Sequence, residues 1–326
     1  MPLCSILGHD VILAGLRHSV AHERVAHAYL FSGPDGVGKR RVALAFLQLL
    51  SCLNRQPGPD ACGACRPCRL LADGRHPDLV TLERDGQFIK IDQVREVVRM
   101  LRFPPVDAAV RAVIVHDADA MNDAAANALL KTLEEPAPRN VFVLLSSRPN
   151  AMLATIRSRC QQVRFGVLPR ETVAAWLTRE RGLDAETADE VAGLSEGSLA
   201  QAERLVDPKL EALRNQWLDT LQGLPLEGPT AMLALAEDLG TSKDDLLAVI
   251  DVLRSAMRDV LLASVDASQL RRTFPGRRLP VLPSRLAHGA LTLLAESESA
   301  VYRNVNPRLV AEHVLFGLRR AIQEAA

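Results

Sequence analysis

The chain has 326 residues, with 39 basic and 39 acidic side chains and therefore no formal net charge at pH 7. This length allows two or three domains, and a hydrophobic content of 48% is ordinary for a globular protein. A neutral balance does not favour free-standing binding to nucleic acid or to a membrane surface. No segment reaches the roughly 18 apolar residues of a membrane helix, and the first residues lack the basic and apolar regions of a signal peptide. We therefore expect a cytoplasmic protein without membrane contact.

Strand and helix patterns alternate along the first half of the chain. Strands are predicted at 28–31, 78–82, 112–115, 141–145 and 161–165, and helices at 11–26, 41–50, 91–101 and 122–133. The strand at 112–115 is apolar throughout, as a strand buried on both faces should be. This alternation predicts an α/β fold with a parallel sheet that helices cover on both faces, and we assign it to a first domain at 1–166.

The strand patterns stop after Pro169, and the rest of the chain is predicted to be helical. Residues 170–206 favour two or three short helices within a small domain at 167–207. A helical domain is expected at 208–326, with a connector over 263–284. Its clearest helix has apolar residues on one stripe and a cap at Thr241 or Ser242. The stripe consists of Leu246, Val249, Ile250, Leu253, Met257, Val260 and Leu261.

A phosphate-loop pattern, Gly33-Pro-Asp-Gly-Val-Gly-Lys-Arg40, separates the first strand from the second helix. In such loops the backbone amides and the lysine cradle phosphates, while a following Ser or Thr hydroxyl binds magnesium. Gly33, Gly36, Gly38 and Lys39 are the candidate nucleotide-binding residues. The hydroxyl position is Arg40, which cannot ligate a cation and adds a positive charge. The loop is therefore degenerate at its magnesium position.

A second departure lies after the 112–115 strand, where phosphate-loop enzymes carry an Asp and then a Glu. Here the two positions are His116 and Asp117. An imidazole does not replace a carboxylate beside magnesium, and hydrolysis needs the metal to neutralise charge on the γ-phosphate. We predict little or no autonomous ATP hydrolysis. Binding of ATP or magnesium stays open, because Lys39 and the loop amides are retained.

Four cysteines, Cys52, Cys62, Cys65 and Cys68, lie close together in the Pro/Gly-rich segment 52–68. In a reducing compartment such clusters indicate metal ligands rather than disulfides. Four thiolates and no open position are typical of structural zinc. An iron–sulfur cluster is the alternative, although the Cys–Pro that follows the ferredoxin triplet is missing here; non-ligating cysteines are a third possibility. Cys4 and Cys160 lie elsewhere and are expected to be ordinary thiols.

Several sequence motifs together resemble those of the bacterial clamp-loader subunits of DNA polymerase III, and among these the delta-prime type. They are His27–Phe31, the glycine loop, the four cysteines, His76-Pro-Asp78, Asn127–Pro136, Ser158-Arg159-Cys160 and, more weakly, Asn304–Arg308. The resemblance is strong from Gly8 to about Phe165. It implies an AAA+ ATPase-like domain, a helical lid and a helical collar. The collars of such subunits join five chains, including gamma/tau and delta, into a ring that loads the sliding clamp onto primed DNA.

The resemblance also implies roles for single residues. In this family the gamma/tau subunits hydrolyse ATP and delta-prime commonly does not, and the departures at Arg40 and His116 favour delta-prime. An active motor carries an arginine just after the Gly-Ser of its lid, whereas Gly197-Ser-Leu-Ala-Gln201 has no cation. Arg159 would be an arginine finger that reaches the ATP site of the neighbouring subunit. Its alternative is an ordinary surface arginine.

Arg95, Arg99 and Arg102 fall on one face of the predicted helix at 91–101. A positive stripe of this kind suits contact with the DNA backbone without sequence reading, although a merely solvated face explains it equally well.

Two other functions remain as alternatives. One is a gamma/tau-type motor, which requires Arg40 and His116 to be tolerated. The other is a phosphate-loop phosphotransferase, which leaves the helical third of the chain without a purpose.

Overall fold

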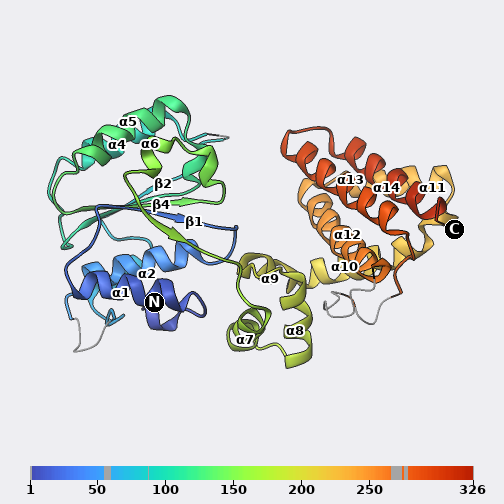
Figure 1. The fold of residues 1–326 in the computed structure, drawn as a ribbon, viewed down its shortest axis with the longest axis horizontal. Helices are drawn as coiled ribbons and strands as arrows, with labels where there is room; N and C mark the ends of the chain where they lie inside the picture. Colours follow the sequence, from blue (N-terminus) through green and yellow to red (C-terminus); the bar gives the residue numbers. More distant parts are fainter. Residues whose placement is uncertain (1, 55–59, 87, 266–273, 275–277, 326) are drawn as a thin grey trace. The chain divides into compact units, whose positions relative to one another are not determined.

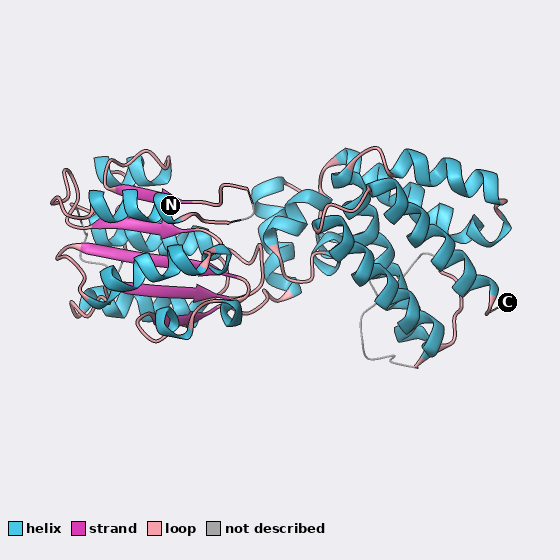
Figure 2. Ribbon diagram, turned by 90° about the horizontal axis from the view of Figure 1, so that it is seen from above, coloured by secondary structure: helices cyan, strands magenta, loops and turns pink. Residues whose placement is uncertain are grey.

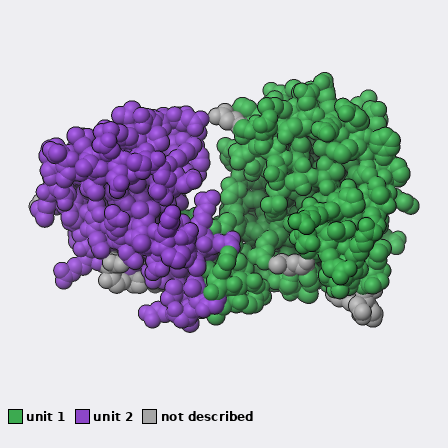
Figure 3. Space-filling view, turned by 180° about the vertical axis from the view of Figure 1, so that it is seen from behind, with its two compact units in different colours: residues 1–181, 196–201 green, residues 182–195, 202–326 purple. Residues whose placement is uncertain are grey.

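The chain divides into two compact units, which Figure 3 shows in different colours. Unit 1 comprises residues 1–181 and 196–201, and unit 2 comprises residues 182–195 and 202–326. The structure, a computed structural model, describes residues 2–54, 60–86, 88–265, 274 and 278–325. Part of the predicted connector at 263–284 lies outside these residues. The three-domain division made from the sequence stays a prediction, and no described helix is long and apolar enough to cross a membrane.

Unit 1 is built on a five-stranded parallel sheet (Figure 2). Its strands are β1 (Ala28–Ser32), β2 (Leu79–Leu82), β3 (Arg111–Val115), β4 (Asn140–Ser146) and β5 (Gln161–Arg164), in the order β2-β3-β4-β1-β5. Leu30 of β1 pairs with Leu144 on one side and with Gln162 on the other. The five predicted strands and the α/β fold class are therefore confirmed.

Helices cover both faces of this sheet (Figure 1). They are α1 (Asp10–Ala21), α2 (Lys39–Ser51), α3 (Arg66–Ala72), α4 (Ile91–Met100), α5 (Asp123–Glu134) and α6 (Ala154–Arg157). Successive strand residues point to opposite faces, so Phe31 and Ile114 pack with α1 and α2, whereas Leu30 and Val113 pack with α4 and α5. The carboxyl ends of the strands are left free to carry loops, and the candidate site lies there.

The first helix is shorter than the sequence predicted. It ends at Ala21 rather than at residue 26, because Glu23 adopts the left-handed conformation, with φ of 55°. The Arg24 amide then donates to the Ser19 carbonyl at 2.8 Å, which closes the helix in the manner of a Schellman motif. Two short helices, α3 and α6, were not predicted at all. Each begins beside candidate site residues, α3 among the cysteines and α6 just before Arg159.

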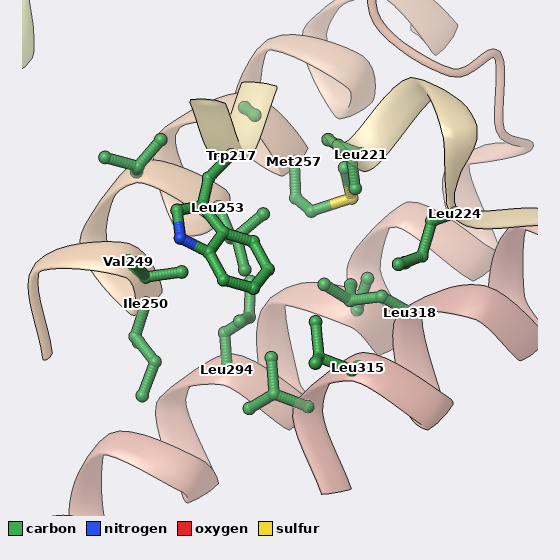
Figure 4. Packing of buried hydrophobic residues seen from close by; sticks show 14 of the residues in the cluster. Trp217, Leu221, Leu224, Val249, Ile250, Leu253, Met257, Leu294, Leu315 and Leu318 are labelled. Carbon is green, nitrogen blue, oxygen red and sulfur yellow. The ribbon is translucent and has the colours of Figure 1, made fainter. Parts of the chain in front are cut away.

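The remainder of the chain is helical, as expected. Residues 170–206 form α7 (Arg170–Arg181), α8 (Ala185–Leu194) and α9 (Leu199–Leu205), and unit 2 continues with α10 (Pro208–Gly223), α11 (Pro229–Leu239), α12 (Lys243–Ser264), α13 (Ser284–Tyr302) and α14 (Pro307–Gln323). The Ser242 hydroxyl accepts the Asp245 amide at 3.2 Å and caps α12, which decides between the two predicted caps. Trp217, Leu253 and Leu315 meet in the core of this bundle (Figure 4).

Candidate functional site

The phosphate-loop segment connects the carboxyl end of β1 to the first residue of α2. Its amide at Gly33 donates to the Ser146 carbonyl at the end of β4, at 3.1 Å. Gly33, Gly36 and Gly38 have φ of 149°, 74° and 103°, a region that residues with a side chain rarely adopt. The glycine spacing therefore serves the backbone turn itself, and the strand–loop–helix order expected from the sequence is present.

Lys39, the predicted phosphate-binding lysine, is bonded to its own loop. Only 8% of the residue is exposed. Its Nζ donates to the carbonyl oxygens of Gly33 and Pro34, each at 2.7 Å, and lies 3.6 Å from an Asp35 carboxylate oxygen. Burial lowers the pKa of Lys39, while Asp35 acts in the opposite direction. The ammonium group thus closes the loop from within, in the place from which it would otherwise reach a phosphate.

The other carbonyls of the loop have partners from distant parts of unit 1. The Gly36 carbonyl accepts the amides of Leu199 and Ala200, in the first turn of α9, at 2.9 and 3.3 Å. The Nε2 of His9 lies 2.9 Å from the Val37 carbonyl oxygen, which fits a hydrogen bond that the ring donates. The lid segment at 196–201 and the segment before α1 therefore both hold the loop.

His116 stands where a carboxylate would bind magnesium, at the end of β3. Its side chain is 17% exposed, and its Nε2 lies 3.7 Å from a Glu83 carboxylate oxygen. Burial, and then the charge of Arg40, lower the pKa of His116, so the ring is neutral at neutral pH. Asp117, which follows it, is bound to the Arg84 Nε at 2.8 Å. Arg40 and His116, which both depart from the enzyme pattern, are thus close enough to interact electrostatically, and neither supplies a metal ligand.

Asp119 is a site residue that the sequence reasoning missed. Its carboxylate accepts the Ser146 hydroxyl at 2.6 Å and the Arg148 Nε at 3.1 Å, and its side chain is almost fully buried. Burial acts to raise the pKa of Asp119, but these bonds lower it, so the carboxylate stays ionised. It fixes the end of β4 beside the phosphate loop. A polar serine closing an otherwise apolar strand was the available signal.

Arg159, the predicted arginine finger, lies between α6 and β5. Its guanidinium is 2.6 Å from a Glu134 carboxylate oxygen and donates to the Thr155 carbonyl at 2.9 Å. About a third of the side chain, 35%, is exposed. The neighbouring Cys160 is buried, which raises its pKa to about 12. That thiol is a poor nucleophile at neutral pH, in keeping with an ordinary cysteine.

The three arginines proposed from the sequence to follow DNA are all exposed. Arg95 and Arg99 lie on α4, opposite the buried Val94 and Val97, and Arg95 is 3.6 Å from Asp92. Arg102 lies just beyond the end of α4 at Met100, in a turn rather than on the helix. Their role in DNA contact stays a prediction.

The four clustered cysteines come together at the far end of α2. Their Sγ atoms all lie within 4.8 Å of one another. Tetrahedral zinc with Zn–S bonds of about 2.3 Å needs sulfur atoms about 3.8 Å apart, so a small shift suffices. Cys52 follows the last residue of α2, and Cys65 and Cys68 lie at the start of α3. The geometry fits a four-coordinate metal without an open position.

The acidities of these thiols also fit a metal. Burial raises the pKa of Cys68 and of Cys52. Burial acts in the same direction on Cys65, but hydrogen bonds from backbone amides outweigh it and lower the pKa of Cys65 to about 6, and such bonds also lower that of Cys62. Metal ligation needs all four cysteines as thiolates. Cys62 and Cys65 already ionise more readily than an ordinary thiol, whereas Cys52 and Cys68 require a nearby cation to do so.

A partly buried carboxylate, Asp60, ties this cluster to the first residues of the chain. It accepts the amides of Leu3 and Cys4 at 3.0 and 2.5 Å and lies 3.5 Å from an Arg17 guanidinium nitrogen. Leu3 is fully buried in the same core as Cys68. The Cys-rich segment is therefore anchored in unit 1 rather than being a separate appendage.

The chain is similar in sequence to known proteins. Residues 8–169 match the family described as DNA polymerase III, delta subunit. The chain is 39% identical to DNA polymerase III subunit delta' of Pseudomonas aeruginosa over 65% of each chain, and 38% identical to that of Escherichia coli over 53% of this chain and 52% of the relative. The chain thus spans between half and two thirds of the length of these relatives.

Two further relatives widen the comparison. Subunit gamma/tau of Mycobacterium tuberculosis is 34% identical over 53% of this chain and 30% of its own length. A crystal structure of a DNA polymerase III gamma subunit-related protein from Thermotoga maritima superimposes with a TM-score of 0.50. It covers 94% of this chain and 98% of the solved chain at 19% identity. That likeness concerns the fold alone, an AAA+-like sheet unit followed by helices.

Proposed function

This chain belongs, through residues 8–169, to the DNA polymerase III delta-prime subunit family, and on that premise we propose that it is a non-hydrolysing clamp-loader subunit. In DNA replication it would assemble in the cytoplasm with gamma/tau and delta subunits. The ring they form would load the sliding clamp onto primed DNA. The chain's own part would be to complete the ring and to assist hydrolysis in a neighbouring subunit.

The observation that carries this proposal is the internal bonding of the phosphate loop. Lys39 is occupied by the carbonyls of Gly33 and Pro34. Arg40 and His116 stand at the two positions where a hydroxyl and a carboxylate would bind magnesium. Phosphoryl transfer relies on that metal and on the lysine to neutralise charge, so a loop in this state is a structural element rather than a catalytic one.

Arg159 is proposed to act as an arginine finger in a neighbouring subunit's ATP site. Its guanidinium is held by Glu134 and by a backbone carbonyl, yet a third of the side chain is exposed. A phosphate that approached from outside could replace the carboxylate as its anionic partner. Stabilisation of transition-state charge by such an arginine raises turnover about 10³- to 10⁵-fold.

Two supporting parts complete the proposal. The Cys52, Cys62, Cys65 and Cys68 thiolates would hold a structural zinc ion that orders the segment between α2 and α3. The ion would contribute folding free energy there and take no part in the chemistry. The exposed Arg95, Arg99 and Arg102 would contact phosphates of the loaded DNA without reading sequence.

A gamma/tau-type motor is the second candidate. The 34% identity to gamma/tau of Mycobacterium tuberculosis supports it, as does the retained Lys39. It requires Lys39 to leave its two carbonyl partners and magnesium to bind without its usual ligands. ATP binding by the purified chain with and without magnesium separates the two candidates, because a magnesium-dependent gain in affinity is expected only of the motor.

The deciding experiment measures ATP turnover of a reconstituted loader that contains Arg159→Ala. Turnover is expected to fall about 10³-fold or more, while assembly of the ring is unchanged. Arg75→Ala is the matched control, because it removes an exposed arginine that precedes β2, at the amino end of the sheet. Unchanged turnover with Arg159→Ala would remove this residue from the mechanism. Rapid ATP hydrolysis by the purified chain alone would favour the motor instead.

A further inference from the structure

A groove of about 590 Å³ lies in unit 1 beyond the carboxyl ends of β1, β4 and β5. Its lining includes Pro34, Pro149, Arg157, Arg164 and Phe165. We call it the arginine groove. Gly33 and Pro34 of the phosphate loop line the groove, whereas Gly36, Gly38 and Lys39 do not, so the groove borders that loop without including the rest of its cradle. Its position at the carboxyl edge of a parallel sheet is where ligands of open α/β folds bind.

The charge of the arginine groove is unbalanced. Arg157 and Arg164 line it, and none of the residues that line it is acidic. Arg157 donates from its NH1 to the neutral Asn150 side chain at 3.0 Å. Its Nε is buried and, within the described residues, makes no hydrogen bond. For Arg164 the described part of the chain likewise supplies no carboxylate within ion-pair distance.

An arginine donor that is withdrawn from water without a partner is unfavourable. Because the guanidinium plane presents donors in a fork, a phosphate is an anion that suits it. The size of the groove falls within the range of small-molecule sites, about 300 to 1,000 Å³. Pro34, Pro149 and Phe165 offer apolar surface beside the two cations. These features together fit a ligand with a phosphate at one end and a flat or apolar part at the other.

We propose that the arginine groove binds a phosphate ester of nucleotide size, with Arg157 and Arg164 holding the phosphate and the two prolines flanking the remainder. The phosphate could belong to a free nucleotide or to one unit of a single strand, and the chemistry recognised is the same. The proposal does not depend on the finger role of Arg159.

The test titrates the full-length chain with AMP and with a five-residue oligothymidylate, and follows binding by calorimetry. The double variant Arg157→Gln/Arg164→Gln is expected to bind the better of the two probes at least about tenfold more weakly, because two charge-assisted hydrogen bonds are lost. Arg75→Gln removes a cation from the other edge of the sheet and should bind as the native chain does.

The outcomes are distinguishable. Stronger binding of AMP supports a free nucleotide as the source, and stronger binding of the oligothymidylate supports a strand. Equal affinity in the double variant would overturn the proposal. Failure of the native chain to bind either probe at millimolar concentration would overturn it too. If the double variant does not fold, Arg164→Gln alone decides, because Arg164 is exposed.

Discussion

The two ends of α2 carry the two candidate ligand sites of unit 1, and they differ in one respect. At the amino end, the phosphate loop has partners within the chain for Lys39 and for the carbonyls of Gly36 and Val37. At the carboxyl end, four thiols gather within 4.8 Å, and the two most buried of them, Cys52 and Cys68, resist ionisation. One end of the helix is complete without a ligand, and the other is not.

This difference separates two ways in which a helix end can be used. A phosphate loop whose polar groups are internally bonded stabilises the fold whether or not nucleotide is present. A cluster of thiols gains stability only when a cation converts them to ligands. The comparison predicts that metal removal disturbs the carboxyl end of α2 strongly, whereas changes at the amino end have the smaller effects of altered packing and charge.

The largest effect is expected from Cys68→Ser, which removes a fully buried thiol of the cluster. Zinc content should fall from one ion per chain to none, and affinity by at least about 100-fold, since loss of even an outer-shell partner costs 10- to 100-fold. Metal analysis and competition with a chromogenic chelator measure both quantities. The matched control is Cys160→Ser, which alters an equally buried thiol outside the cluster and should leave zinc content unchanged.

The extent of unfolding sharpens this prediction. Removal of the metal should release the segment 52–68 while the sheet persists, because the opposite face of the sheet has a core without the clustered cysteines, around Leu30, Val113 and Phe142. Hydrogen exchange, read segment by segment, distinguishes local from global opening. Retention of zinc by Cys68→Ser would contradict the four-thiolate site, and loss of protection throughout the sheet would contradict a merely local role for the metal.

A smaller effect is expected at the amino end from Gly36→Ala. A Cβ at this position would collide with the Ser198 hydroxyl and lie 2.8 Å from the Ala200 Cβ, and φ is 74°. The matched control is Gly74→Ala, where φ is 66° and no atom lies within 4 Å of the added carbon. Both variants suffer the same backbone strain, so the difference between them isolates the contact with the lid segment.

Overpacking of this kind costs about 1 to 3 kcal/mol, and Gly36→Ala should be less stable than Gly74→Ala by that amount in the free energy of unfolding. Urea denaturation of the two variants measures it. Equal stabilities would mean that the lid segment does not rest on the phosphate loop in solution. The internal bonding of the loop, on which the non-hydrolysing role depends, would then lose its support at Gly36.

Local patterns predicted most of unit 1. Apolar runs such as Val113-Ile-Val115 identify buried strands from composition alone, and the glycines at Gly33 and Gly38 mark a turn with positive φ. Cysteine spacing likewise predicted a cluster that the structure brings together. Each of these inferences rests on residues close together in the chain, the widest span being that from Cys52 to Cys68.

The features that escaped prediction join residues far apart in the chain. Asp119 meets Ser146, Asp60 holds the amide of Leu3, and Gly36 accepts from Leu199. No periodicity encodes such pairs, because each depends on how the strands are ordered in the sheet. The sequence shows that Lys39 is retained, but only the folded loop shows that its ammonium group already has hydrogen-bond partners.

The smallest effect is expected in the pH dependence at His116. Burial and then Arg40 hold the folded-state pKa of His116 below its unfolded value, against the opposing charges of Glu83 and Asp117. The unfolded chain therefore binds the proton more readily, so stability should decline as the pH falls below about 6.5 and through the lower folded-state pKa. In His116→Gln this contribution is absent.

The measurement compares the loss of stability in native protein with that in His116→Gln. Burial also lowers the pKa of His76, so acidification destabilises both proteins through that residue. Between pH 7.5 and 5.5 the free energy of unfolding should fall more for native protein than for His116→Gln, by on the order of 1 kcal/mol. Denaturation at the two pH values measures both losses. Identical losses would mean that the ring is solvated rather than enclosed beside Arg40. A carboxylate at this position would place a negative charge next to Arg40, where the imidazole is neutral. The variant His116→Asp should therefore lose the acid sensitivity of the imidazole while offering the amino end of α2 the magnesium ligand that it lacks.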